Sequence, residues 1–236
     1  CGNACTHDAI VGEEDPHCKA CGLDIVAKAK NFSNEVEYGP YYFASVDAAV
    51  NDVWKVHSGR APIITLLADT SSDCNVEWYA STYDGLTIDL AGHTLTLTGN
   101  NSTTCMLTTI RNSSDTHAEV RGTVNVYTKA TGGSVTLTVP ETKNDLTISE
   151  VNIKENGRAS LAGGSFGSIT IGEDSRANAL ADLLASGYYF ADTATGEPAA
   201  LYGENGNALT KLTNVTVKPC SHNGSEVVYD PSDGMW

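Results

Sequence analysis

Alternating apolar and polar residues dominate the middle of the chain. Between residues 62 and 172, short runs rich in Thr, Val, Ile and Leu are separated by Gly and Asn. This alternation is typical of strands with one buried face. The predicted strands cover residues 63–67, 86–90, 94–98, 106–110, 123–127, 135–139, 146–153 and 168–171.

Comparable Ile or Val positions recur through this region. They are Ile64, Ile88, Ile110, Val126, Ile148 and Ile169. A period of about 20 to 24 residues is too long for hairpins of short strands, and it suits stacked coils that each carry two or three strands. The pattern therefore predicts a mainly β chain folded as a parallel β-helix, with an antiparallel sandwich as the alternative.

Two segments show helical periodicity. The run SVDAAVNDVWKVHSG has Ser45 as N-cap and Gly59 as stop, which predicts an amphipathic helix over about residues 45–58. We expect this helix to cover the N-terminal end of the coil, where bare strand edges favour aggregation. ANALADLLASGYYF, from residue 177, predicts a second helix. Two strands should follow it, ALY and NVTV, in a C-terminal cap over about residues 176–219.

The N-terminal segment CTHDAIVGEEDPHCKACG combines C-x-H with C-x-x-C. Cys5, His7, Cys18 and Cys21 form the four-ligand set of a tetrahedral structural zinc site. Metal binding would supply the folding free energy that so short a segment lacks. A disulfide is the first alternative, because oxidising compartments favour it. A redox pair is the second, although nothing predicts the thioredoxin-like fold that lowers a thiol pKa.

The region between predicted strands holds further candidates. Cys74 and Cys105 form either a disulfide or a pair of buried thiols. Trp78, Tyr79 and Tyr83 lie close together in NVEWYASTYDG. Such aromatic residues contact partner proteins at interfaces and stack on sugar rings, and the alternative is packing over the coil. We expect them to form a partner-binding surface.

The net charge of the chain argues against some classes of partner. The chain has 236 residues and a net charge of −15, from 29 acidic and 14 basic side chains, which argues against nucleic acid and anionic membranes as partners. No run is long and apolar enough for a transmembrane helix. Single acids and bases are scattered among Thr and Ser, so we expect solvated, outward-facing side chains and no catalytic residues. The acids and bases that could have formed a catalytic site are Asp69, Asp73, Asp89, Asp115, Arg111, Arg121 and Arg158. We expect His93 to be a turn residue that forms hydrogen bonds within its own coil.

Four phrases resemble a known family when they are taken in order. ITLLADTSSDCNVEWYASTYDGLTIDLAGHTLTLTG, LAGGSFGSITI, LADLLASGYYFAD and the Cys/His segment are similar to the coils, helix and spacers of large exported tandem-repeat proteins of Gram-positive gut bacteria. The resemblance implies a right-handed β-helix, export and tandem repetition. It also implies immunoglobulin binding, since some members are superantigen-like.

The expected organisation follows from this resemblance. Residues 1–24 form a zinc-type spacer, residues 25–219 form the β-helix module, and residues 220–236 begin a truncated next spacer with Cys220-Ser221-His222. We expect a non-catalytic, extracellular module of a cell-wall or secreted bacterial protein. It should bind a host molecule, with immunoglobulin as the leading partner, beside neighbouring modules of the same chain. The alternatives are a carbohydrate-binding module, a polysaccharide lyase and a pure spacer.

Overall fold

The computed structural model describes residues 10–12, 16–19, 21–33, 36–55, 60–73, 85–98, 109–127, 134–141 and 145–220. These residues form a mainly β structure, as predicted. No helix among them is long and apolar enough to cross a membrane.

The elements fall into three groups along the chain. The N-terminal group is β1 (Ile10–Val11), β2 (His17–Cys18), β3 (Ala27–Ser33), β4 (Val36–Phe43) and α1 (Val46–Lys55). The central group is β5 (Arg60–Leu66), β6 (Thr70–Ser72), β7 (Thr87–Asp89), β8 (Thr94–Leu97), β9 (Thr109–Arg111), β10 (Ala118–Val126), β11 (Val135–Val139), β12 (Leu146–Ile153), β13 (Gly157–Leu161) and β14 (Ser165–Ile171). The C-terminal group is the short 3-10 helix η1 (Leu180–Leu183), β15 (Tyr188–Asp192) and β16 (Lys211–Pro219). Each predicted central strand overlaps an observed one.

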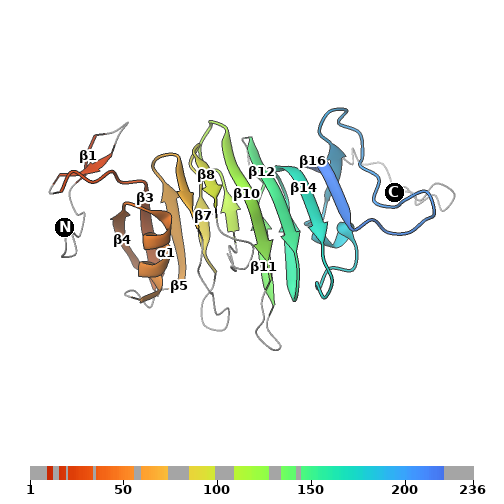
Figure 1. The fold of residues 1–236 in the computed structure, drawn as a ribbon, viewed down its shortest axis with the longest axis horizontal. Helices are drawn as coiled ribbons and strands as arrows, with labels where there is room; N and C mark the ends of the chain where they lie inside the picture. Colours follow the sequence, from red (N-terminus) through yellow and green to blue (C-terminus); the bar gives the residue numbers. More distant parts are fainter. Residues whose placement is uncertain are drawn as a thin grey trace.

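Consecutive strands from β5 to β14 alternate between two seven-stranded sheets (Figure 1). The β5 sheet has the order β13-β11-β9-β7-β5-β3-β4, and the β10 sheet has the order β15-β16-β14-β12-β10-β8-β6. Every pairing among β5 to β14 is parallel. The antiparallel sandwich is therefore wrong for this region, and antiparallel pairing is confined to β1–β2 and to the strands added at either end.

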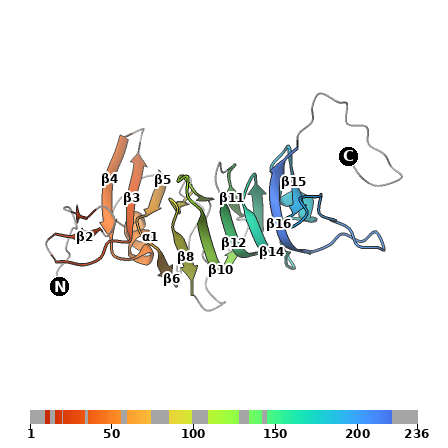
Figure 2. The same ribbon diagram turned by 90° about the horizontal axis from the view of Figure 1, so that it is seen from above.

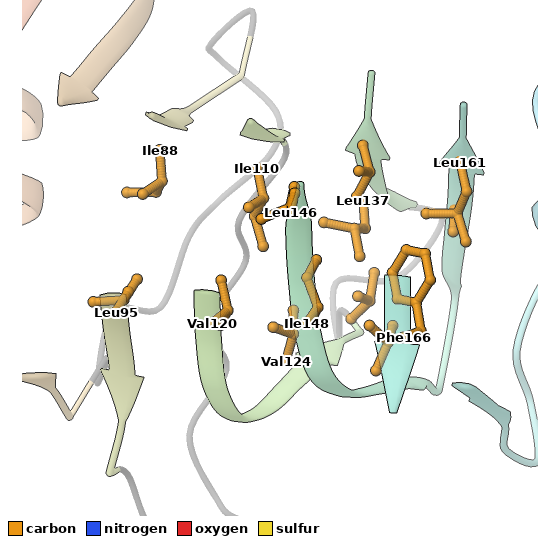
Figure 3. Packing of buried hydrophobic residues seen from close by; sticks show 14 of the residues in the cluster. Ile88, Leu95, Ile110, Val120, Val124, Leu137, Leu146, Ile148, Leu161 and Phe166 are labelled. Carbon is orange, nitrogen blue, oxygen red and sulfur yellow. The ribbon is translucent and has the colours of Figure 1, made fainter. Parts of the chain in front are cut away.

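The core consists of apolar side chains stacked in register between the two sheets. In the β5 sheet, Ile64, Ile88 and Ile110 pair directly across β5, β7 and β9. In the β10 sheet, another column runs through Leu95, Val120, Ile148 and Phe166. Figure 3 shows rows from the two sheets facing each other. Of the six recurring positions, only the first three share a column, because Val126, Ile148 and Ile169 lie in different columns of the β10 sheet.

The long strands of the β10 sheet bend where the alternation breaks. In β12 the buried residues Ile148 and Val151 are three apart, so the two residues between them, Ser149 and Glu150, are both left half-buried. The neighbouring strand β14 has the same spacing, with Gly167 between its buried residues. A Cβ at Gly167 would lie 2.5 Å from the Ser149 carbonyl oxygen. Close backbone contact at the bend therefore favours glycine there.

The predicted cap helix exists as α1. Ser45 Oγ accepts a hydrogen bond from the Ala48 N–H at 3.1 Å, which is the predicted N-cap. The buried side chains Val46, Ala49 and Val50 face the core, and α1 contacts β3, β4, β5 and β6. Figure 2 shows α1 at the same end as β3 and β4. The helix therefore covers the N-terminal end of the core.

The second predicted helix is wrong. Only η1 forms, and the following aromatic residues Tyr188 and Phe190 lie in strand β15. The Asp182 carboxylate accepts bonds from the backbone N–H groups of Asn178 and Ala179, which fixes a single turn. The predicted strand NVTV lies in β16, whereas ALY forms no strand and contributes one bridge, between Tyr202 and Ala208.

Candidate binding sites

Half of the predicted zinc site lies on a described turn. The Cys18 N–H donates to the Leu23 carbonyl at 2.8 Å, and the Gly22 N–H donates to the Cys18 carbonyl at 2.7 Å. Gly22 has a φ of +69°, which closes this turn directly after Cys21. Cys18 is buried and Cys21 is half-buried. Two thiols on one tight turn suit a chelating pair, which is the donor chemistry that zinc prefers.

The other half of that site lies outside the described residues, since Cys5 and His7 are not among them. Within the described ranges, no three or more His, Cys, Asp or Glu side chains gather as a metal site. The predicted partner-binding and disulfide residues are also not among the residues that the structure describes. They are Trp78, Tyr79, Tyr83, Cys74 and Cys105.

Asp89 differs from the solvated side chain that the sequence predicts, because it is only 2% exposed. Its Oδ2 accepts a hydrogen bond from Arg111 Nε at 2.9 Å, across the β7–β9 pair. Its Oδ1 accepts bonds from the backbone N–H groups of Ala91 at 3.2 Å and Ser113 at 3.1 Å. The carboxylate therefore holds two neighbouring turns together, which is a structural role.

Asn112 continues this network. Its Oδ1 accepts from the Gly92 N–H at 2.9 Å, and its Nδ2 donates to the Thr116 carbonyl at 2.8 Å. His93 bonds within its own turn through its backbone N–H, as predicted, while its imidazole lies 3.6 Å from the Asp69 carboxylate on the preceding turn. The other acids and bases named from the sequence are exposed or half-buried, namely Asp69, Asp73, Asp115, Arg111, Arg121 and Arg158. None of these contacts gathers two carboxylates around one substrate position.

A polar cluster that the sequence did not predict lies on the outer face of the β10 sheet. We call it the Glu150 patch, and it comprises Thr123, Asn125, Glu150, Asn152 and Thr170. Thr123 Oγ1 donates to Glu150 Oε2 at 2.6 Å, and Asn152 Nδ2 donates to Glu150 Oε1 at 3.4 Å. Asn125, Asn152 and Thr170 are aligned across β10, β12 and β14. The strand bend brings these groups onto one face.

A second unpredicted feature is a small hairpin that we call the Tyr202 hairpin, residues 201–209. The Gly203 N–H donates to the Asn207 carbonyl and the Leu209 N–H donates to the Leu201 carbonyl, both at 2.9 Å. Leu201 and Leu209 pack against the core. Tyr202 is 59% exposed, more than any other large hydrophobic residue in the described part of the chain. The hairpin therefore presents a tyrosine from a fixed base.

Two carboxylates form hydrogen bonds at the ends of β15. Asp192 ends β15, and its Oδ1 accepts from the N–H groups of Thr195 at 2.8 Å and Ala194 at 3.0 Å. The pKa of Asp192 lies below its ordinary value, mainly because the Thr195 backbone N–H donates to its carboxylate and secondly because the Thr195 hydroxyl does so. Tyr188 donates to Glu141 at 3.2 Å, and burial followed by this carboxylate raises the pKa of Tyr188. The Asp192 bonds close the turn after β15, and the Tyr188 bond joins β15 to the loop after β11.

Comparison with known proteins gave no matching family model, no matching curated protein and no matching solved structure.

Proposed function

We propose that this chain is a non-catalytic binding module whose two sheets are walls of a right-handed parallel β-helix. The alternation of β5 to β14 between two parallel sheets supports the β-helix. The network around Asp89 supports the absence of catalysis, since its acid and base are engaged in joining turns. The net charge and the resemblance to exported repeat proteins support a secreted or cell-wall location.

The observation that carries the binding function is the exposure of Tyr202 on a hairpin with a packed base. Tyrosine is enriched among residues that dominate the free energy of protein association. Exposed polar residues follow it at the hairpin tip, namely Glu204, Asn205 and Asn207. An aromatic side chain with a polar rim is the arrangement expected of a protein-binding site.

Immunoglobulin is the partner that we propose, on the strength of the sequence resemblance. The test is biolayer interferometry of the purified chain with pooled immunoglobulin and with its Fab and Fc fragments. We expect saturable binding to Fab, and Tyr202→Ala should weaken it about tenfold or more. Asn178→Ala, at an exposed asparagine outside the hairpin, is the control and should leave affinity unchanged. Trp78→Ala tests the predicted aromatic segment in the same assay.

Two results would contradict this proposal in different ways. Absence of binding to every fragment at micromolar concentration would remove immunoglobulin as the partner. Binding that Tyr202→Ala leaves unchanged would place the contact surface elsewhere, and Trp78→Ala would then decide whether it lies in the predicted aromatic segment. In a tandem array, several copies of the module would raise the apparent affinity through avidity.

We also propose that the N-terminal segment binds a structural zinc ion. Cys5, His7, Cys18 and Cys21 would hold it, with Cys18 and Cys21 as the chelating pair on the described turn. Zinc in this site would tie the segment together, and four protein ligands leave no position for a reacting water. The segment would then act as a spacer between modules.

A further inference from the structure

The Glu150 patch contains one polar atom that the fold leaves without a partner. Asn125 is 7% exposed, and its Oδ1 is buried with no hydrogen-bond partner among the described residues. Leaving a buried acceptor unpaired costs about 1–3 kcal/mol. The neighbouring Asn152 donates towards Glu150 instead, at the long distance of 3.4 Å. Asn125 Oδ1 therefore requires a donor that this part of the chain does not supply.

The other groups of the patch restrict the chemistry of that donor. Glu150 accepts bonds from Thr123 and Asn152, and an ionised carboxylate has about four acceptor positions, so it can accept further donors. Thr170 adds a hydroxyl that both donates and accepts. The patch therefore offers acceptors at Asn125 and Glu150 and a mixed donor and acceptor beside them.

The charges around the patch argue against an ion. Lys211 is aligned with Thr170 on the adjacent strand, and Lys154 lies two residues beyond Asn152. These two cations disfavour a metal ion or an amine, while Glu150 at the centre disfavours an anion. Neutral hydroxyl groups satisfy both acceptors and can accept bonds from the lysines. The half-buried Tyr127 lies two residues after Asn125 in the chain.

We propose that the Glu150 patch is a carbohydrate-binding site, in which one sugar hydroxyl donates to Asn125 Oδ1 and another donates to Glu150. Asn125 Oδ1 is covered, so a neighbouring side chain must turn aside on binding. Asn152 is placed to do so, because its bond to Glu150 is weak at 3.4 Å. The Glu150 patch lies on β10, β12 and β14 and shares no residue with the Tyr202 hairpin, so either proposal can fail without the other.

The first test uses the apo chain and concerns stability. Asn125→Leu keeps the branching and the number of side-chain heavy atoms and removes the unpaired acceptor. We expect it to raise the melting temperature, because a buried polar group without a partner is replaced by an apolar one. A residue that lowers the stability of the free protein is expected where that residue binds a ligand. A lower melting temperature would overturn the proposal, since it would mean that Asn125 Oδ1 has a partner in solution.

The second test measures binding. The methyl glycosides of glucose, galactose, mannose and N-acetylglucosamine are titrated into ¹⁵N-labelled chain, and the side-chain amide signals of Asn125 and Asn152 are followed by NMR. We expect saturable shifts with at least one glycoside. The affinity, followed at the Asn152 amide, should be about tenfold weaker in Asn125→Leu and Glu150→Gln. Glu119→Gln, at an ion pair with Arg121 outside the patch, is the matched control and should bind normally.

Three outcomes of the titration would overturn the assignment. One is the absence of shifts with all four glycosides at millimolar concentration. Another is a shift that Glu119→Gln weakens as much as Glu150→Gln does. The last is a saturable response of the same amide signals to calcium chloride alone, which would make the patch a cation site.

Discussion

Asp89 is the single side chain on which two neighbouring turns depend. We expect Asp89→Ala to lower the free energy of unfolding by about 3 kcal/mol, because two backbone N–H groups and the Arg111 guanidinium lose their acceptor. Urea unfolding followed by circular dichroism measures this change. Asp69→Ala is the control, since that exposed carboxylate bonds the Thr94 N–H, and its loss should cost less than about 1 kcal/mol.

Equal losses in the two variants would mean that burial of Asp89 does not strengthen its bonds. The sequence could not predict this burial, because an outward position on a strand is ordinarily solvated. Arg111 covers Asp89 from the adjacent strand, 22 residues later in the chain. The burial of Asn125 was not predicted for the same reason, because it depends on the pairing of strands that are distant in the sequence. Cys18 and Cys21 could be proposed as ligands from the sequence because chelating spacing is local, and their zinc binding stays a prediction.

At the scale of elements, the bend in the β10 sheet depends on Gly167. We expect Gly167→Ala to cost about 1–3 kcal/mol, because the new Cβ would lie 2.5 Å from the backbone oxygen of Ser149. Gly203→Ala is the matched control, since its nearest neighbour, a Leu209 side-chain carbon, lies 3.7 Å away. Thermal unfolding of both variants compares the sites. Similar melting temperatures would show that β12 and β14 can separate at the bend without cost.

The central strands were predictable because their alternation is strong and each strand is short. Helix α1 was predictable because Ser45 caps it and one face is apolar. The β3–β4 hairpin was missed, since its sequence includes Gly39-Pro40, which interrupts a strand pattern. The second helix was wrongly predicted because Leu180 and Leu183 do share a buried face, but for one turn only. Tertiary pairing of the aromatic run with β16 then favours a strand.

At the scale of the whole molecule, the two sheets are extended at opposite ends. Strands β3 and β4 extend the β5 sheet at the N-terminal end, and β16 and β15 extend the β10 sheet at the C-terminal end (Figures 1 and 2). Helix α1 contacts the first extension, while η1 contacts β13, the C-terminal strand of the β5 sheet. Pro40 lies in β4, the last strand of the β5 sheet, where proline blocks further strand pairing. The described core therefore ends at both sides, as a self-contained module requires.

The N-terminal segment stands apart from this core, and metal removal tests its proposed role. Pro16 and Cys18 are buried in the described part of this segment, and we expect bound zinc to supply folding free energy. We expect about one zinc ion per chain by mass spectrometry, lost with chelator and in Cys18→Ser, and retained in Cys220→Ser as the control. Chelation should open residues 1–24 to proteolysis while the melting transition of the two sheets stays unchanged. A metal-free chain in which peptide mass spectrometry finds Cys5, Cys18 or Cys21 in a disulfide would instead establish a disulfide in this segment.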